Sequence, residues 1–370
     1  MKAMYKDFRF LDDLIHGTAK KICLSSDIRL DDDEKYNPIH GIKIDVDDLV
    51  IDGMGHFIDA RHFGRIFSIT GKNITIKNVH FMNGYSFSRS KDEETDGVYR
   101  NPILPTGYGG AIYNRGEVTM INCRFTKNHS FSYGGAIVNT SRYPLKLMNC
   151  YFDQNSGYNG GAIFNRGELE ISRCDFYQNG GPIFVPSYNR ILSLDDKFTK
   201  YGGAILNEKQ MEISNSRFSE NYARNGGAIN NFYGEIRASN LIFYRNASKF
   251  AGAINNWKGG IEIENADFRN NVSKIRWDPN YINYASSVTM IEKTEIEYGH
   301  VVGAIFNKGH FRITNCKFEE NQGNINSIYN DDMYECIVEN SQFDGEFDCE
   351  VKNVTNIVNS KFSHVDGERC

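Results

Sequence analysis

The most regular feature of the chain is an alternation of apolar and polar residues in short stretches that recur along most of its length. In one stretch Leu169 and Ile171 alternate with polar neighbours, and Cys174 and Phe176 do the same after an offset of three positions. Alternation with period two predicts β-strands, and an odd offset predicts a bend between two of them. We therefore expect short strands joined by bends, because no segment with a helical period lies inside the pattern.

The pattern belongs to a repeat unit. It reads GGAI, one variable residue and Asn, then a turn, an alternating strand, a small residue and the motif FxxN. Copies begin at Gly109, Gly134, Gly160, Gly202 and Gly226, with degenerate ones at Ala251, Val302 and Ser327. The phenylalanine recurs at 125, 152, 176, 218, 243, 268, 318 and 343, and most steps span 24 to 27 residues. That period is too short for a pair of helices, and the leucine-rich pattern is absent, so it indicates one coil of a β-solenoid.

The predicted fold class is therefore all-β, a single-stranded right-handed parallel β-helix of about ten coils. Stacking the coils in parallel closes the backbone ladders that one coil leaves open. One domain is expected over residues 1–370, with coils over 22–343 and irregular last coils and an end over 344–370.

Residues 1–21 are expected to cap the open end of the solenoid. A short amphipathic helix over residues 7–21 would place Phe10, Leu11, Leu14 and Ile15 on one face. Covering the first coil in this way prevents edge-to-edge pairing of its exposed strands.

Each repeated residue type has a predicted role. Gly-Gly permits a sharp corner, and stacked phenylalanines fill the broad part of the core. The two asparagines of each coil are expected to hydrogen-bond in ladders between coils. Cysteines at a single repeat position, 123, 150, 174 and 316, are expected to be small core residues rather than parts of a disulfide framework.

Three insertions interrupt the repeat, at about Tyr85–Tyr108, Gly180–Tyr201 and Ser273–Val301. Each leaves after the FxxN turn, which is Phe-x-Asn in the first case, and returns just before GGAI, so all three are expected at one corner of the solenoid. They are three coils apart, which is about 14 Å along its axis. Insertions on one face of a solenoid often build its binding surface.

The insertions carry the candidate ligand-binding residues, which combine aromatic rings with charged groups. They are Tyr99, Arg100, Tyr188, Arg190, Asp195, Asp196, Trp277, Asp278 and Tyr281. Aromatic rings stack on the apolar faces of sugars, and carboxylates accept hydrogen bonds from sugar hydroxyls. The alternative is that these aromatic residues only pin long loops onto the solenoid.

Composition and charge limit the classes of partner that the chain is expected to bind. The net charge is −5, from 42 basic and 47 acidic residues, which gives no footprint for nucleic acid or an anionic membrane. No window is apolar enough for a transmembrane helix. No cofactor is expected, and no metal either, because zinc ligands are not clustered along the chain.

The repeated motifs resemble those of the pectate-lyase-like (pectin lyase-like) right-handed β-helix superfamily. Within it, Gly134-Gly135-Ala136-Ile137 and Phe152-Asp153-Gln154-Asn155 are similar to the repeats of chlamydial polymorphic membrane proteins. The stretches LVIDGMGHFIDA and GKNITIKNVHFMNG look like the first coils of methanogen adhesin-like proteins. The resemblance implies a location at the cell surface or outside the cell. The N-terminus lacks the unbroken apolar core of a signal peptide, which leaves a cytoplasmic location open.

The resemblance and the insertions together favour a non-catalytic, adhesin-like module that presents a loop-decorated face to a glycan or protein partner. The superfamily also includes polysaccharide lyases and glycoside hydrolases, so an enzyme acting in a groove beside the same loops is the alternative. Its acidic pairs would be Asp195–Asp196 or Asp331–Asp332. The polygalacturonase motif order is absent, which makes catalysis the weaker reading. A purely structural rod is the third reading.

Overall fold

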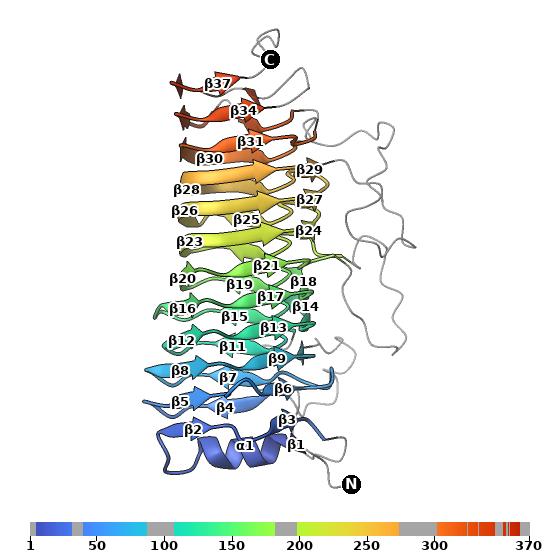
Figure 1. Ribbon diagram of the computed structural model, residues 1–370, viewed down its shortest axis with the longest axis vertical. Helices are drawn as coiled ribbons and strands as arrows, with labels where there is room; N and C mark the ends of the chain where they lie inside the picture. The colour runs from blue at the N-terminus through green and yellow to red at the C-terminus, as the bar shows by residue number, and fades with distance from the viewer. Residues whose placement is uncertain are drawn as a thin grey trace, which may run out of the picture.

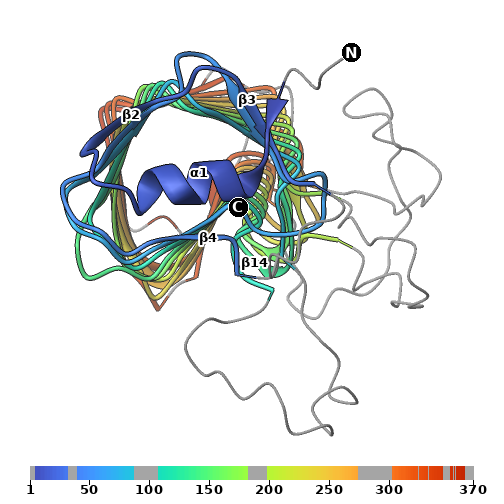
Figure 2. The ribbon, with the colours of Figure 1, turned by 90° about the horizontal axis from the view of Figure 1, so that it is seen from below.

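The computed structural model describes residues 5–31, 40–86, 107–181, 198–273, 302–323, 325–331, 333–344, 351–352, 354 and 356–362. These residues form an elongated solenoid whose strands all run parallel, with 31 of them in one continuous sheet (Figure 1). Seen from below, each coil is a rounded triangle (Figure 2). The all-β parallel β-helix predicted from the repeat is confirmed.

Three faces make up each coil, and we number them in chain order from the GGAI motif. The first face is formed by β4 (Ile42–Ile44), β7 (Phe67–Ile69), β11 (Ile112–Asn114), β15 (Ile137–Asn139), β19 (Ile163–Asn165), β22 (Ile205–Asn207), β25 (Ile229–Phe232), the starts of β28 (Ile254–Arg269) and β30 (Ile305–Thr314), β32 (Ile328–Asn330) and β35 (Val351–Lys352).

The second face is formed by β2 (Lys21–Cys23), β5 (Val50–Asp52), β8 (Ile74–Lys77), β12 (Val118–Ile121), β16 (Leu145–Met148), β20 (Glu168–Ser172), the first parts of β23 (Gln210–Ser219) and β26 (Glu235–Tyr244), later parts of β28 and β30, β33 (Cys336–Glu339) and β36 (Asn356–Val358). These twelve strands exceed the expected ten coils, because the ladder continues beyond the recognisable repeats at both ends.

The third face is formed by β1 (Tyr5–Lys6), β3 (Asp27–Arg29), β6 (Phe57–Asp59), β9 (His80–Met82), β13 (Arg124–Thr126), β17 (Tyr151–Asp153), β21 (Asp175–Tyr177), the ends of β23, β26 and β28, β31 (Lys317–Glu319), β34 (Gln342–Asp344) and β37 (Lys361–Phe362).

The bend between the second and third faces is made by one residue in the left-handed conformation, which is usually asparagine. Asn78, Asn122 and Asn149 have φ of 54°, 54° and 55°. Asparagine tolerates this region better than most other non-glycine residues. The odd offset between the two alternating stretches is this single turn residue.

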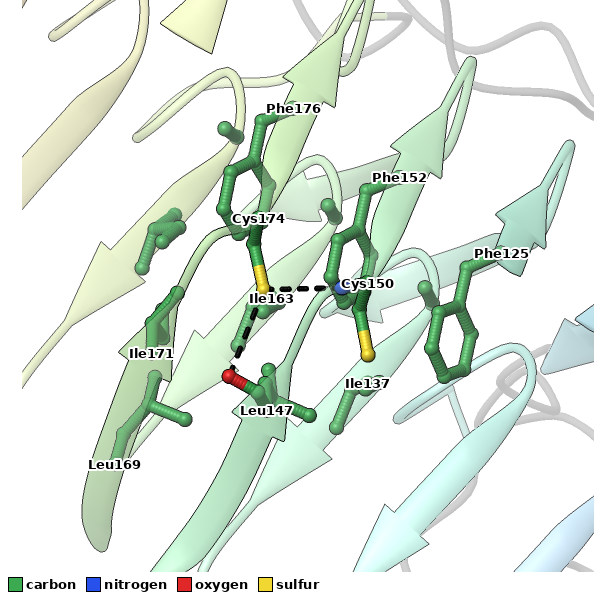
Figure 3. Close-up of a cluster of buried hydrophobic side chains, with 14 of the residues drawn as sticks. Phe125, Ile137, Leu147, Cys150, Phe152, Ile163, Leu169, Ile171, Cys174 and Phe176 are labelled. Atoms are coloured by element: carbon green, nitrogen blue, oxygen red, sulfur yellow. Dashed lines mark hydrogen bonds between the residues drawn. The ribbon is translucent and has the colours of Figure 1, made fainter. Parts of the chain in front are cut away.

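Phenylalanine fills the core along the third face. Rings at 81, 125, 152, 176, 218, 243, 268, 318 and 343 stack one per coil, with centroids 4.7–5.1 Å apart. Figure 3 shows three of these rings beside the leucine and isoleucine side chains of the other two faces. The predicted stack is confirmed, and it begins one coil earlier than the sequence indicated, at Phe81.

Two buried asparagine ladders run along the corners of the solenoid, as predicted. The first links 114, 139, 165, 207, 231, 256, 307 and 330 by side-chain amide bonds of 2.6–3.0 Å. The second links 128, 155, 179, 221, 246, 271 and 321 by bonds of 2.9–3.1 Å. In the second ladder, backbone N–H groups also donate to the next amide oxygen, as Asn155 does to Asn179 at 3.1 Å. The ladders therefore satisfy turn groups that would otherwise be buried without partners.

The cysteines of the repeat are buried, free thiols in the core, as expected. The backbone N–H of Cys150 donates to Sγ of Cys174 at 3.3 Å (Figure 3). In the next coil Ser216 takes the same position and accepts from Cys174 N at 3.1 Å. Cysteine and serine both accept this bond, whereas Leu241 and Ala266 fill the same position in the following coils without an acceptor.

A helix covers the first coil, and it is shorter than predicted. Helix α1 spans Phe8–Ile15, with Asp7 as its N-cap accepting from Phe10 N at 2.8 Å. Phe8, Leu11 and Ile15 are its fully buried residues, whereas Phe10 is only partly buried. The expected helix over residues 7–21 is wrong at its C-terminal end, because Lys21 already pairs with Val50 in β2.

Candidate functional site: the insertion corner

A fourth set of short strands lies between the third and first faces, and the insertions leave from it. We call this region the insertion corner. It contains β10 (Tyr85–Ser86), β14 (His129–Tyr133) and β18 (Ser156–Asn159), and further along the axis β24 (Tyr222–Ala223), β27 (Ala247–Ser248) and β29 (Val272–Ser273). Figure 2 shows β14 on the opposite side of the coil from β2, which belongs to the second face.

Both ends of every insertion pair with this corner. Before the first insertion Tyr85 pairs with His129, and after it Tyr108 pairs with Tyr133. Gly180 and Tyr201 flank the second insertion and pair with Tyr222 and Asn225; Val272 and Val302 flank the third and pair with Gln322 and Ile325. The insertions precede β11, β22 and β30 on the first face, so successive insertions are three coils apart, about 14 Å.

The paired glycines are required where the chain turns from this corner into the first face. Gly109 has φ of 60°, and a Cβ on it would lie 2.2 Å from the carbonyl oxygen of Ile112. A Cβ on Gly110 would lie 2.3 Å from the carbonyl oxygens of Gly135 and His129. No side chain fits at either position, so GGAI marks a corner at which successive coils touch.

Arg65 closes the base of the first insertion. Its side chain is fully buried, and its Nη2 donates to Ser86 Oγ at 3.3 Å and to Tyr108 O at 2.6 Å. Its Nε donates to the carbonyls of Tyr108 and Gly109, both at 3.1 Å. One guanidinium thus joins the residue before the insertion to the residues after it. Burial lowers the pKa of Arg65 to about 10, so the group is still charged at neutral pH.

Sequence reasoning missed Arg65, although a signal was present. Phe67 pairs with Ile112, so Gly64-Arg65-Ile66-Phe67 aligns with Gly109-Gly110-Ala111-Ile112. Arginine therefore occupies the place of the second glycine. An arginine at a position that is glycine in the following coils was the signal that the sequence offered.

An aromatic cluster packs on the outside of the first face, beside the returns of the first two insertions. Its buried members are Tyr113, Val138, Phe164 and Leu206, and Tyr108, Tyr133 and Tyr201 pack against them. The Tyr108 and Tyr133 rings stack at 4.9 Å, and Tyr133 contacts Phe164 at 4.5 Å. These tyrosines anchor the chain where it rejoins the solenoid.

The return of the third insertion has a matching anchor. Val302 is fully buried with Ala251, Phe306 and Ile325, and Tyr329 packs against them. The Phe306 and Tyr329 rings stack at 5.1 Å. At all three insertions, therefore, the described residue on the return side is held by outward-facing apolar side chains of the first face.

All nine candidate ligand-binding residues lie outside the described residues. They are Tyr99, Arg100, Tyr188, Arg190, Asp195, Asp196, Trp277, Asp278 and Tyr281. What the structure defines is the corner from which their segments start and to which they return.

A groove outlined among the described residues is not at this corner. It measures about 590 Å³ and crosses β16, β20, β23 and β26 on the second face, lined by charged and hydroxyl side chains such as Lys146, Glu170, Glu212 and Ser214. The second face lies away from β14 (Figure 2). An enzyme acting in a groove beside the loops gains no support from this groove.

Other groups weighed for chemistry have structural partners. Asp331 pairs with Lys308 at 3.1 Å, and His56 lies 3.0 Å from Asp27. In the described part of the chain, no three His, Cys, Asp or Glu side chains converge as a metal site. Nor is any helix there long and apolar enough to cross a membrane.

Comparison with known proteins agrees with this architecture. Residues 36–191 match the family model described as a right handed beta helix region. No curated protein matches the chain. Among solved structures, one titled "L. reuteri 53608 SRRP" aligns over 98% of both chains at 14% identity and a TM-score of 0.33, a value too low to carry an argument. The stacked parallel strands give the chain a parallel β-helix fold, and the match of residues 36–191 to the right-handed β-helix model agrees with it.

Proposed function

We propose that the protein is a non-catalytic, adhesin-like binding module that displays its insertions to a glycan. The observation that carries the proposal is the construction of the insertion corner. Arg65 ties Ser86 to Tyr108 across the base of the first insertion. Burying a charge is costly even when several hydrogen bonds satisfy it, and here the buried guanidinium fixes where the first insertion begins and ends.

The solenoid supplies the stiffness that such a display requires. Ladders and ring stacks repeat in every coil around the corner, so the three loop bases keep fixed spacings of about 14 Å. Binding residues are often carried on loops that a rigid scaffold positions. Fixed bases reduce the conformational entropy that the loops lose when a ligand binds.

The insertion residues supply the proposed chemistry. Tyr188, Trp277 and Tyr281 would stack on the apolar faces of sugar rings, and Asp195 and Asp278 would accept hydrogen bonds from sugar hydroxyls. A location at the cell surface fits this function and is part of the proposal. A protein partner and a polysaccharide lyase or glycoside hydrolase are the competing readings.

The test is an immobilised glycan panel that reads retained protein and released products from the same wells. We expect retention without product, and at least tenfold weaker retention for Trp277→Ala and Tyr188→Ala. Tyr143→Ala is the matched control, because Tyr143 contacts Arg142 and Lys72 away from the insertion corner. Product release that Asp195→Asn abolishes would replace the proposal with the enzyme reading. No retention on any glycan would reject it.

A further inference from the structure

The turn between the first and second faces carries an aromatic feature that the repeat does not require. In most coils the ladder asparagine is followed by a short turn, as in Asn165-Arg166-Gly167. Two neighbouring coils contain one extra residue there, Tyr233 and Lys258, with φ of 60° and 58°. The register between β28 and β30 shifts between Trp257 and Gly260 for the same reason.

Aromatic residues occupy this turn on two successive coils, at a position that Lys308 holds in the next coil. Phe232 is 38% exposed and Tyr233 is 56% exposed, and their rings meet edge to face at 4.6 Å. Trp257 is the register partner of Phe232 in the next coil and is partly exposed. We call these three residues the aromatic edge. Elsewhere in the described chain, left-handed non-glycine positions are mostly Asn, Gln or charged residues, so an aromatic ring at Tyr233 is exceptional.

Polar groups flank the rings on each side. The Nζ of Lys258 lies 5.7 Å from the centre of the Tyr233 ring, and the Nζ of Lys308 lies 4.9 Å from the Trp257 ring. Lys308 is itself paired with Asp331 at 3.1 Å. The patch therefore offers exposed ring surface beside hydrogen-bond donors and an acceptor.

We propose that the aromatic edge is a second glycan-binding site, which takes a neutral hexopyranose unit. The apolar C–H face of a pyranose would lie on the Tyr233 ring, against which the Phe232 ring stands at 88°, and its hydroxyls would bond Lys258 and the Lys308–Asp331 pair. Charge complementarity favours a neutral ligand, because the two lysines of the patch are matched by two carboxylates. Asp331 pairs with Lys308, and the Glu235 carboxylate lies over Gly260 at the same turn as Lys258.

The size of the patch decides against a protein partner. A stable protein interface buries about 800 Å² on each side, from roughly 20 to 30 residues. The aromatic edge contains three rings at the turns of two coils and is bordered by charged side chains, which suits one or two sugar units. The aromatic edge lies between the first and second faces, so it is separate from the insertion corner. This inference is therefore tested independently of the proposed display of insertions.

The test uses intrinsic fluorescence, since the chain has only two tryptophans. In the full-length Trp277→Phe variant, Trp257 is the only remaining tryptophan. We would titrate this variant with cellohexaose, mannohexaose and xylohexaose, and measure heats of binding in parallel. We expect a saturable change in Trp257 emission with at least one hexaose.

Two variants in the Trp277→Phe background make the test specific. Tyr233→Asn removes the ring and keeps a residue that tolerates the left-handed conformation, so it should fold and bind at least tenfold more weakly. Tyr244→Ala is the control; that tyrosine lies on the third face beside Arg217 and Arg245, and binding should not change.

Three results would overturn the inference. One is the absence of both emission change and heat with all three hexaoses. Another is full affinity in Tyr233→Asn. The third is concentration-dependent self-association in sedimentation that Tyr233→Asn abolishes, which would make a second copy of the chain the occupant. Loss of panel retention in the insertion variants, with hexaose binding intact, would leave this inference standing.

Discussion

Replacing Asn179 by alanine should be one of the most damaging single changes in the solenoid. Its Oδ1 accepts from the backbone N–H and from Nδ2 of Asn155, at 3.1 and 2.9 Å. Its Nδ2 donates to Phe152 O at 2.9 Å and to Asn221 Oδ1 at 3.1 Å. The side chain is fully buried, so these partners have no route to water.

The cost can be worked out group by group. Truncation removes the side-chain partner of two buried backbone groups, the N–H of Asn155 and the carbonyl of Phe152. The side-chain Nδ2 of Asn155 also loses its bond to Asn179, but it keeps its bond to Phe125 O at 2.9 Å. A buried polar group left without a partner costs about 1–3 kcal/mol. We therefore expect a loss of about 4 kcal/mol in the free energy of unfolding, once a small term for the cavity is added.

A matched control lies in the neighbouring coil. Asn149 is exposed, and its Nδ2 makes one surface bond to Asn122 at 3.3 Å. Asn149→Gly keeps the left-handed φ of 55° without strain. This variant should lose less than about 1 kcal/mol, because water replaces the lost bond.

The assay is urea unfolding followed by circular dichroism, together with amide hydrogen exchange at Asn155. Asn179→Ala should lower the midpoint far more than Asn149→Gly, and the Asn155 amide should lose protection only in the former. Solenoids can unfold in segments, so exchange at one amide gives the local readout that a global midpoint lacks. Equal midpoints in the two variants, or a protected Asn155 amide in Asn179→Ala, would refute the group-by-group accounting.

Four further predictions follow from buried residues. Phe176→Ala should cost about 3–5 kcal/mol in urea unfolding, because its ring is fully buried and stacks at 4.7 Å on both sides; a cost below 1 kcal/mol would show that the stack relaxes. Arg65→Met should increase proteolysis at the first insertion more than at the others, because the bonds from Arg65 to Ser86 and Tyr108 are lost. Equal cleavage at all three insertions would show that these bonds do not hold the ends of the first insertion together. The hydrogen bond with Cys150, and after it burial, raises the pKa of the Cys174 thiol, so a maleimide should label exposed Cys23 in the native protein and Cys174 only after unfolding, as read by peptide mass mapping. Burial lowers the pKa of His129 from 6.5 to about 3; because the folded state then binds fewer protons than the unfolded state, stability should fall as the pH drops from 6.5 toward 3, and His129→Gln should flatten that slope.

The fold could be predicted from the sequence because the determining interactions repeat. Phe152 and Phe176 are equivalent positions 24 residues apart, and in the structure they lie on top of each other at 4.7 Å. A unit that cannot bury its own apolar face can do so only against a copy of itself. The identity of each position therefore predicts its neighbours in the coils above and below, without knowledge of distant contacts.

The candidate site was predictable only in outline. The breaks in the repeat place all three insertions at one corner, and the described ends of each insertion lie there. The ligand-binding role of residues such as Tyr188 and Trp277 stays a prediction, because those residues lie outside the described part of the chain. The role of Arg65, which hydrogen-bonds residues on both sides of the first insertion, became evident only when strand pairing aligned it with a glycine position.

What the sequence determined by itself was the order of faces, the ladders and the stack, since each depends on a residue and its own repeats. Tertiary structure decided the environment of residues whose type is not specific. Asn149 and Asn155 are both repeated asparagines six positions apart, yet the first is exposed and the second is fully buried. Phe232 and Phe243 likewise differ, at 38% and 0% exposure. The physical reason is that burial depends on whether the backbone turns a side chain into the coil or away from it. Phe232 follows the ladder asparagine, a position that Trp257 and Lys308 hold in the next two coils, whereas Phe243 pairs with the core ring of Phe218.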